Sequence, residues 1–455
     1  MSRRRDGSSS STDDEIVTSE EGIRTLSRLM MMDDADTEED ISEAFMSDKS
    51  LGHKTIFMFP AIMEIRQQRA KVVAIGPYNH KEEMLYFGLD YKWQILKLMT
   101  QGFQLDTGKF LGNMAKKELE LRNCYEEEVE DLYQMATKDF LQIMLLDGCF
   151  ILFALKCLDG KNQSSFDTVE LFLSKFQGLG NAIVIYQLIT NVKNLVSQLE
   201  MHRESVICDL LLMENQIPFS VLQELLCLCP DFRDFVGSSI KDLALSSFKC
   251  VRPKMNKELS EQPEEFLHLL DVFHWSRVPE DKYKLIDNQI NNQTMPGVSM
   301  LRATEFHHSG VRLKRKKSGS YLDVVIKNSS SKKDCVIKVP AIDIKNYQFS
   351  IFESLVTFEE RYEKRGVCFT AFVECMASLL GSENDAKLLQ KCGIIPKDTD
   401  TSDDYVIKFF HQLSHCIKPV ALMPHPYEGY KSAVDRVRET VEKSKATEAR
   451  CWFRF

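Results

Sequence analysis

The stretch DLLLMENQIPF, Asp209–Phe219, places a carboxylate and two amides inside an apolar run. Four apolar residues precede the polar triplet Glu214, Asn215 and Gln216, and apolar residues resume directly after it. A helix that ends before the triplet leaves up to four carbonyls without partners, and a helix that begins after it leaves N–H groups free. Amide side chains both donate and accept hydrogen bonds, so the triplet predicts a satisfied corner between two buried helices.

Two residues beside the amides fit the same interpretation. Pro218 suits the first turn of the second helix, because its missing N–H is not needed there. The Glu214 carboxylate is expected to accept from N–H groups at that helix start, where the helix dipole favours negative charge. The apolar periodicity places the two helices at Ser205–Met213 and Phe219–Cys227.

The alternative interpretation is a pocket that binds a ligand or supports a reaction. Gly76-Pro77 is typical of a turn, and Tyr78 and His80 follow it, with an imidazole that titrates near neutral pH. The sequence contains none of the motifs GxSxG, HExxH, GxxxxGK[ST] or GxGxxG, so it indicates no familiar reaction. An enzyme of unknown reaction would build its site around Glu214, Asn215 and His80, with Asp147.

Charge is unevenly distributed along the chain. Residues 1–50 hold 14 of the 67 acidic and 6 of the 58 basic residues, which leaves 53 acids and 52 bases in residues 51–455. The first 50 residues are also rich in serine and poor in aromatics, and this composition predicts a disordered acidic tail. Because nucleic-acid binding relies on a basic excess, we expect no nucleic-acid partner.

Cysteine use and hydropathy indicate the cellular compartment. The 13 cysteines are scattered without a CxxC pair, and the N-terminus shows no secretory signal. We therefore expect reduced thiols, no metal site, no cofactor and a cytoplasmic or nuclear location. The apolar run Phe140–Leu158 has Asp147 at its centre, where a membrane helix would be strongly disfavoured, so it predicts a buried helix.

The apolar spacing predicts a mainly α fold. Residues 51–455 are expected to form one large multi-helix domain, with a polar loop at 276–300. Near residues 310–342 the period changes to two, which predicts a small antiparallel β insertion. In the same region, the adjacent His307 and His308 would point to opposite faces of a strand and would chelate a metal poorly.

A basic tract begins this β insertion. It could serve as a nuclear address or contact an anionic surface, but a solvated hairpin edge is the favoured interpretation, because lysines at an edge block further strand pairing. The tract consists of Arg312, Lys314, Arg315, Lys316 and Lys317.

Six motifs carry a family resemblance. VVAIGPYNH, LLDGCFIL, DLLLMENQIPF, HLLDVFH, RATEFHHSGVRLK and LLQKCGII occur in this order between Lys54 and Lys418. Together they resemble the plant domain-of-unknown-function 247 family, also called uncharacterised protein family 0481. The chain departs from the family pattern at Asn79-His80-Lys81, where His-His-Gly is usual, and at Thr357–Glu360, where the pattern reads AFEQ.

The resemblance implies a mostly helical fold and a plant origin. Family members usually carry a C-terminal membrane helix and are often membrane-associated, but we expect no membrane span in this sequence. Some members are implicated in self-incompatibility in grasses, which implies recognition. We therefore expect a non-enzymatic recognition or scaffold protein that binds a protein partner, in signalling or in self-incompatibility-like recognition.

Overall fold

The computed structural model describes residues 54–57, 70–80, 85–126, 132, 134–159, 169–170, 182–251, 262–278, 301–317, 322, 324–328, 335–341, 348–395 and 402–416. The predicted acidic tail at 1–50, and all but the first three residues of the predicted loop at 276–300, lie outside these residues.

The described chain is mostly helical with one small sheet, as the sequence predicts. The first group of elements consists of η1 (Pro77–Asn79), α3 (Leu89–Phe103), α4 (Thr107–Ala115), α5 (Glu118–Arg122), α7 (Thr137–Cys157), α9 (Ala182–Met201), α10 (Arg203–Asp209), α11 (Phe219–Cys227), α12 (Pro230–Val236), α13 (Ile240–Ser247) and α14 (Leu269–Trp275). The second group consists of α17 (Ala303–His308), β1 (Arg312–Lys316), β2 (Val325–Asn328), β3 (Cys335–Pro340), α18 (Gln348–Arg361), η2 (Glu363–Arg365), α19 (Cys368–Leu379), α20 (Glu383–Lys391) and α21 (Asp403–Cys416).

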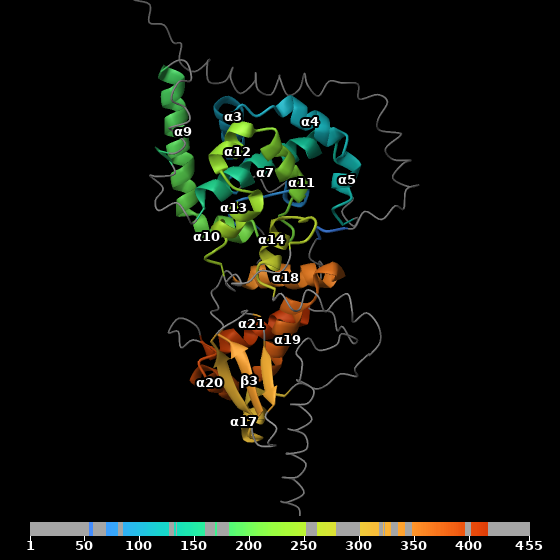
Figure 1. Cartoon of the computed structure of the whole chain (residues 1–455), viewed down its shortest axis with the longest axis vertical. Coiled ribbons are helices and arrows are strands. Elements are labelled where there is room, and N and C mark those ends of the chain that lie inside the picture. The colour runs from blue at the N-terminus through green and yellow to red at the C-terminus, as the bar shows by residue number, and fades with distance from the viewer. Residues whose placement is uncertain are drawn as a thin grey trace, which may run out of the picture.

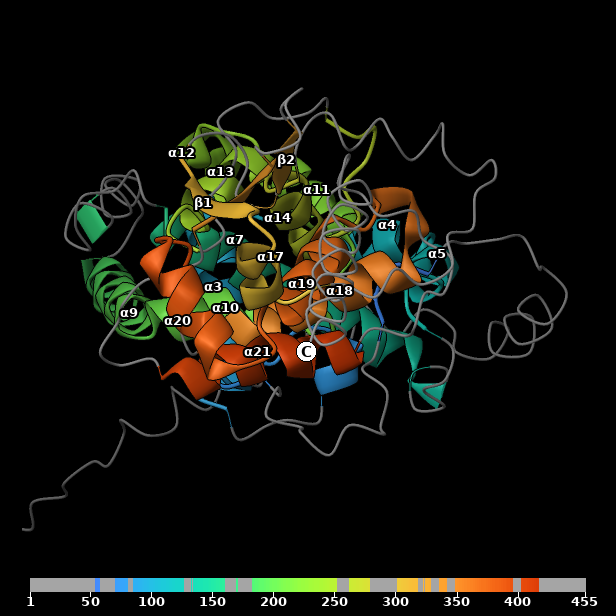
Figure 2. The same ribbon diagram turned by 90° about the horizontal axis from the view of Figure 1, so that it is seen from below.

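The two groups lie at opposite ends of the long axis. Figure 1 shows α3–α14 at one end and the sheet with α17 and α19–α21 at the other, with α18 between them. Seen along that axis in Figure 2, α18–α21 overlie the first group.

Helix α7 is the central helix of the first group. Every residue from Met144 to Cys157 is buried, and α3, α4, α11 and α13 pack against it. Within the described residues it is the one helix long and apolar enough to cross a membrane by length and composition. The other helices cover it, which confirms the prediction of a buried helix at Phe140–Leu158.

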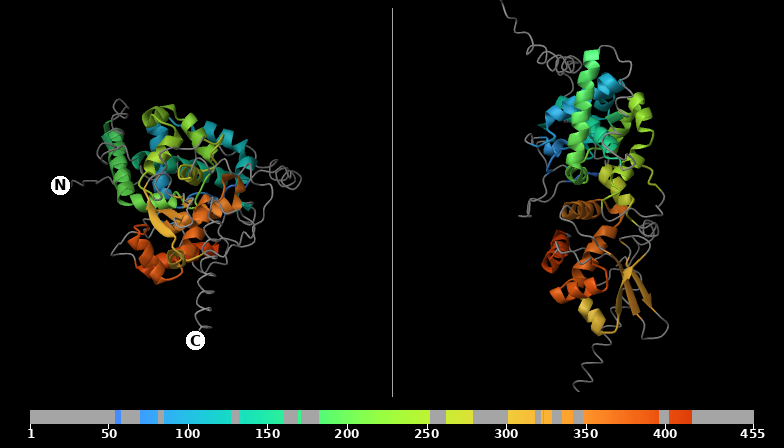
Figure 3. Two further views of the ribbon diagram at one scale, coloured as in Figure 1. Left: turned by 60° about the horizontal axis from the view of Figure 1, so that its bottom comes forward. Right: turned by 90° about the vertical axis from the view of Figure 1, so that its left-hand side faces the viewer.

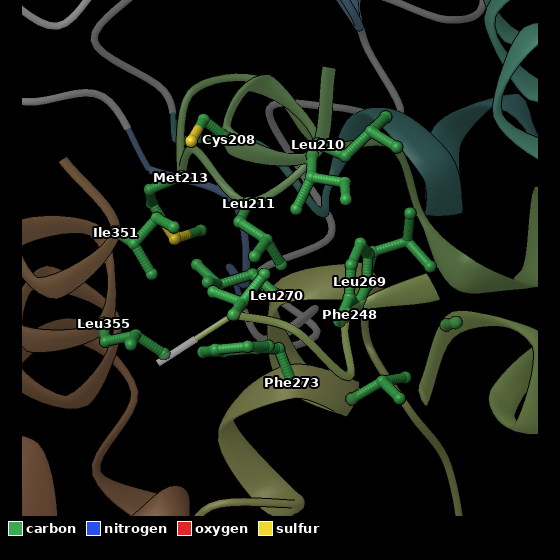
Figure 4. Close-up of a cluster of buried hydrophobic side chains, with 14 of the residues drawn as sticks. Cys208, Leu210, Leu211, Met213, Phe248, Leu269, Leu270, Phe273, Ile351 and Leu355 are labelled. Carbon is green, nitrogen blue, oxygen red and sulfur yellow. The ribbon is translucent and has the colours of Figure 1, made fainter. Parts of the chain in front are cut away.

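Helix α18 joins the two groups through apolar contacts. Figure 4 shows Ile351 and Leu355 of α18 facing a cluster that includes Met213 and Leu270 from the first group. The hydroxyl of Ser354 also accepts a 3.1 Å hydrogen bond from the Met213 amide. Buried side chains from both groups form one hydrophobic cluster. This continuity supports a single domain over 51–455, which stays a prediction.

The small sheet has a different strand arrangement from the predicted antiparallel unit. Its order is β1-β3-β2, with β2 antiparallel and β1 parallel to β3. The apolar strand β3 takes the centre, where both its edges are paired, whereas the cation-rich β1 occupies an edge. The antiparallel expectation was wrong for β1, because a local alternation of residues does not specify which strands pair.

Some predicted boundaries also differ. Helix α10 ends at Asp209 rather than Met213, because the chain turns over the next residues, and α11 begins at Phe219 as predicted. His307 and His308 lie in the last turn of α17 and not on a strand.

Candidate functional site

An extended segment before η1 is held by side chains from helices. The Asp209 carboxylate accepts hydrogen bonds from the amides of Lys71 (3.0 Å), Val72 (2.8 Å) and Val73 (3.0 Å). Asp209 is the last residue of α10 and is buried. Burial raises the pKa of the Asp209 carboxyl, and the three amide hydrogen bonds oppose this rise. The carboxylate thus binds main-chain groups that would otherwise need a neighbouring strand.

Asn215 extends this arrangement along the same segment. Its Oδ1 accepts from the Ile75 amide at 2.6 Å and from Asn79 Nδ2 at 3.0 Å. Its Nδ2 donates to the carbonyls of Val73 at 3.1 Å and Asp209 at 2.9 Å. The side chain is 1% exposed, and both of its donors and its acceptor have partners.

Gln216 satisfies the corner between α10 and α14. Its Nε2 donates to the carbonyls of Leu210 at 2.9 Å and Leu212 at 2.8 Å, which follow the end of α10. Its Oε1 accepts from the Leu270 amide in the first turn of α14 at 3.2 Å. The hydrogen bonds of both amides therefore agree with the satisfied-corner interpretation, although Gln216 reaches α14 and not α11.

The predicted position of Pro218 is wrong by one residue, whereas the predicted role of the Glu214 carboxylate at the start of α11 stays a prediction. Pro218 is the N-cap residue of α11, one position before its first turn, and provides no side-chain cap. The Phe219 amide instead donates to the Leu267 carbonyl at 2.8 Å. Glu214 is half-buried, and its main-chain carbonyl accepts from Asn79 Nδ2 at 2.9 Å. The Leu267 carbonyl, 48 residues further along the chain, thus pairs with the first amide of α11. No local feature of the sequence indicates this partner.

Asp147 and Lys92 hold the end of the extended segment. Asp147 Oδ2 accepts from the Gly76 amide at 2.7 Å, while its Oδ1 forms an ion pair with Lys92 Nζ. Lys92 Nζ also donates to the Ala74 carbonyl at 2.6 Å. This buried pair joins α3 to α7, and both charges are hydrogen-bonded to the segment between them.

Gly76 is required by the geometry of this contact. Its φ is +75°, in the left-handed region, and a Cβ there would lie 2.6 Å from the Gln216 carbonyl oxygen. The motifs around Gly76 and Gln216 therefore meet in one close main-chain approach. Pro77 follows directly and is buried at the start of η1.

Tyr78 and His80 lie at the outer end of this arrangement. The Tyr78 hydroxyl accepts from the Glu126 amide at 2.7 Å, and its ring packs edge-on against Tyr125, with 5.3 Å between centroids. His80 is exposed, and its Nδ1 lies 2.5 Å from the Pro77 carbonyl. Of the proposed enzyme constellation, Asp147 and Asn215 thus bind neighbouring amides in the interior, whereas the imidazole lies at the surface.

A second buried polar cluster connects α14 with η2. The Asp271 carboxylate forms a two-pronged ion pair with Arg365, with both N–O distances 2.8 Å, and also accepts from the Leu267 amide at 3.0 Å. His268 is the N-cap of α14, where its ring accepts a hydrogen bond from the Asp271 amide. Its Nε2 lies 3.0 Å from the Thr55 carbonyl. Burial lowers the pKa of His268 to about 4, which keeps the imidazole neutral at pH 7.

The carboxylate of Glu359 caps helix α19. It accepts from the amides of Phe369 (3.0 Å) and Thr370 (2.8 Å) and from the Thr370 hydroxyl (2.9 Å). His274 Nε2 lies 2.7 Å from the same carboxylate. The charge sits at a helix N-terminus, where the dipole favours it, and ties α14, α18 and α19 together.

Comparison with known sequences places this structure in a family. The sequence profile of DUF247, described as plant protein of unknown function, matches residues 56–454. The chain belongs to the DUF247 family. The UPF0481 protein At3g47200 of Arabidopsis thaliana is 27% identical to this DUF247 chain over 373 residues, which are 76% of the chain and 68% of that relative. No solved structure matches it.

The second cluster was missed in the sequence of this DUF247 protein. His268, Asp271 and His274 recur every three residues in HLLDVFH, which places all three on the buried first turns of α14. That spacing was the available signal, but the partners Arg365 and Glu359 lie about 90 residues further on. Across the described residues, no group of three or more His, Cys, Asp or Glu is arranged to hold a metal ion.

The basic tract of the DUF247 chain lies apart from both clusters. Arg312, Lys314, Arg315 and Lys317 are exposed and Lys316 is half-buried, on or directly after the edge strand β1. The predicted edge position is confirmed, although the hairpin is formed by β2 and β3.

Proposed function

We propose that this DUF247 protein is a non-enzymatic recognition or scaffold protein that acts through protein–protein interaction. One observation carries the proposal: the buried groups with catalytic potential bind main-chain amides. Asp147, Asp209 and Glu359 each accept from at least one buried amide, and Asn215 uses both its donors and its acceptor. Groups fixed in this way hold loops in place and offer little to a substrate.

Exposed apolar side chains give a second line of support. Tyr86 is 40% exposed, Leu89 53% and Met201 71%, near the start of α3 and the end of α9. The Tyr86 ring also packs against His202, with 4.2 Å between centroids. Tyrosine and methionine are enriched in protein interfaces, and tyrosine buries a large area at modest entropic cost.

Free thiols favour an intracellular setting for this interaction. Every cysteine whose side chain is described is free, and several are buried, as in proteins of reducing compartments. The cytoplasm or nucleus is therefore the proposed location, with a role in signalling or self-incompatibility-like recognition.

The test has a binding arm and a catalytic arm. The full chain is purified from plant tissue with its partner, and the complex is rebuilt from the two purified proteins and measured by calorimetry. We expect stoichiometric binding that His80→Ala with Glu214→Ala leaves within about twofold, because His80 is exposed, Glu214 is half-buried and neither belongs to the exposed apolar set. Leu89→Ser with Met201→Ser is the matched surface pair and is expected to weaken binding at least about tenfold.

The catalytic arm addresses the alternative enzyme around Glu214, Asn215 and His80. Plant metabolite extract is incubated with the wild-type chain and with His80→Ala/Glu214→Ala. Consumption of a metabolite by the wild type alone, with no partner that binds in the rebuilt assay, would establish the enzyme and refute the recognition proposal.

A further inference from the structure

The outer face of the sheet carries a row of positive charge. On β1, Arg312 and Lys314 are exposed and Lys316 is half-buried, while Leu313 between them is buried. Side chains alternate between the two faces of a strand, so the three cations share one face.

Strand β3 adds to the same face. Lys314 is paired in register with Lys338, and Arg312 with Val336. The alternating residues Ile337 and Val339 are 1% and 0% exposed, so they form the inner face, while Lys338 is half-buried on the outer one. Like charges directly opposite each other on paired strands are destabilising. A nearby anion would therefore relieve the repulsion between Lys314 and Lys338.

The described helices cover only the inner face. Figure 1 shows the sheet in front of α20 and α21, and the right-hand view of Figure 3 shows the same helices on one side of it. Buried Ile337, Val339 and Leu313 make the apolar contact with that side. The cationic face points away from these helices.

The anion with the best match lies in the same chain. Residues 33–43, DDADTEEDISE, hold seven acids and no base, within a tail whose balance is 14 acids to 6 bases. Residues 51–455 hold 53 acids and 52 bases, so no overall basic field steers the folded part to a polyanion such as nucleic acid.

The covalent link makes this partner available at all times. The 11 residues from 43 to 54 can extend about 40 Å, and the acidic segment 33–43 adds about 35 Å to this reach. A covalently tethered segment binds within its own molecule, so this contact does not depend on protein concentration.

We propose that the acidic segment Asp33–Glu43 docks on the outer face of the sheet, against Arg312, Lys314 and Lys338, and masks that face within the same molecule. The contact is electrostatic, so salt weakens it and added negative charge in the tail strengthens it. An external anionic partner gains access only by displacing the tail.

Zero-length carbodiimide cross-linking of the full chain, followed by peptide mass spectrometry, tests the contact. We expect amide links from residues 33–43 to Lys314 or Lys338 at least about fivefold more often than to Lys97 or Lys193, which are exposed on α3 and α9. The links should fall several-fold in about 0.5 M salt. The double variant Lys314→Gln with Lys338→Gln removes two cations of the outer face. The double variant Lys97→Gln with Lys193→Gln removes two exposed lysines elsewhere and is its control.

Three results would overturn the proposal. The first is an even distribution of links over all exposed lysines. The second is that an isotope-labelled and unlabelled mixture yields links between copies only, which would assign the face to a second molecule. The third comes from a polyanion column. Neutralising the seven tail acids is expected to increase retention, and this gain should be lost in Lys314→Gln/Lys338→Gln. An equal loss in Lys97→Gln/Lys193→Gln would show that the gain reflects net charge alone.

Discussion

At the residue scale, Gly76 and three buried polar side chains fix one segment of main chain. Asp209 accepts from the amides of residues 71–73, Asn215 from the amide of Ile75, and Asp147 from the amide of Gly76. The amides in MENQ were predictable as structural, because polar groups in an apolar run must find partners. Their partners were not, since 140 residues separate Ile75 from Asn215.

Replacing Gly76 tests the close main-chain approach. Gly76→Ala should lower the free energy of unfolding by about 3 kcal/mol, because the left-handed φ is unfavourable and the new Cβ overlaps the Gln216 carbonyl. Gly112→Ala, in helix α4 with nothing within 4 Å of its Cβ position, should be neutral or stabilising by up to about 1 kcal/mol. Equal effects in urea denaturation would contradict this account.

His268 gives the structure a defined acid sensitivity. Its pKa is about 4 in the fold, whereas an unperturbed imidazole titrates near 6.5. Between these values only the unfolded chain takes up the proton, so stability is full above pH 6.5 and falls as the pH drops towards 4, by up to about 3 kcal/mol. His268→Asn keeps an N-cap acceptor and should flatten the dependence in this window. An unchanged slope in denaturation series from pH 7 to 4 would show that His268 is not its source.

At the element scale, helices were more predictable than the pairing of strands. Phe219–Cys227 was predicted to the residue, because its apolar stripe starts directly after Pro218. Helix α14 begins at Leu269, because His268 caps it and Asp271 binds the Leu267 amide. The parallel pairing of β1 with β3 follows from tertiary packing, which no local period encodes.

The attachment of α17 to α20 depends on one carboxylate. Asp385 accepts from the Thr304 amide (2.8 Å) and hydroxyl (2.7 Å) and from the Ser382 hydroxyl (2.6 Å). Burial alone would raise the pKa of Asp385, but these hydrogen bonds from Ser382 and Thr304 outweigh it and lower the pKa. The stabilisation is therefore present above the usual carboxyl pKa and is lost as the pH falls through the lowered value.

Removing that carboxylate should loosen both helices. Asp385→Ala is expected to cost about 2–3 kcal/mol of unfolding free energy, since three hydrogen bonds to a charged carboxylate are lost. Glu383→Ala breaks only an exposed ion pair with Lys387 and should stay within about 0.5 kcal/mol. Hydrogen exchange at α17 amides should accelerate in the first variant alone; equal rates in both would refute the link.

At the scale of the whole molecule, α18 makes the two groups of elements depend on each other. Leu355 is fully buried between them, and the apolar cluster is continuous. Leu355→Ala should destabilise the chain by about 2–5 kcal/mol. One domain predicts that denaturation followed by hydrogen exchange in α7, in the first group, and in α21, in the second, shows the same shifted transition. Separate transitions would show two independently folding units.

Amide hydrogen exchange at Ile75 and Gly76 tests the central claim most directly, since that claim assigns the buried polar groups to main-chain support. In the wild-type chain these amides should exchange at least about a thousandfold more slowly than in an unstructured peptide. Asn215→Ala should accelerate exchange at Ile75 more than tenfold relative to Leu98 in α3. Rapid exchange at Ile75 in the wild type, or no change in the variant, would show that Asn215 is free for another purpose and would contradict the structural assignment.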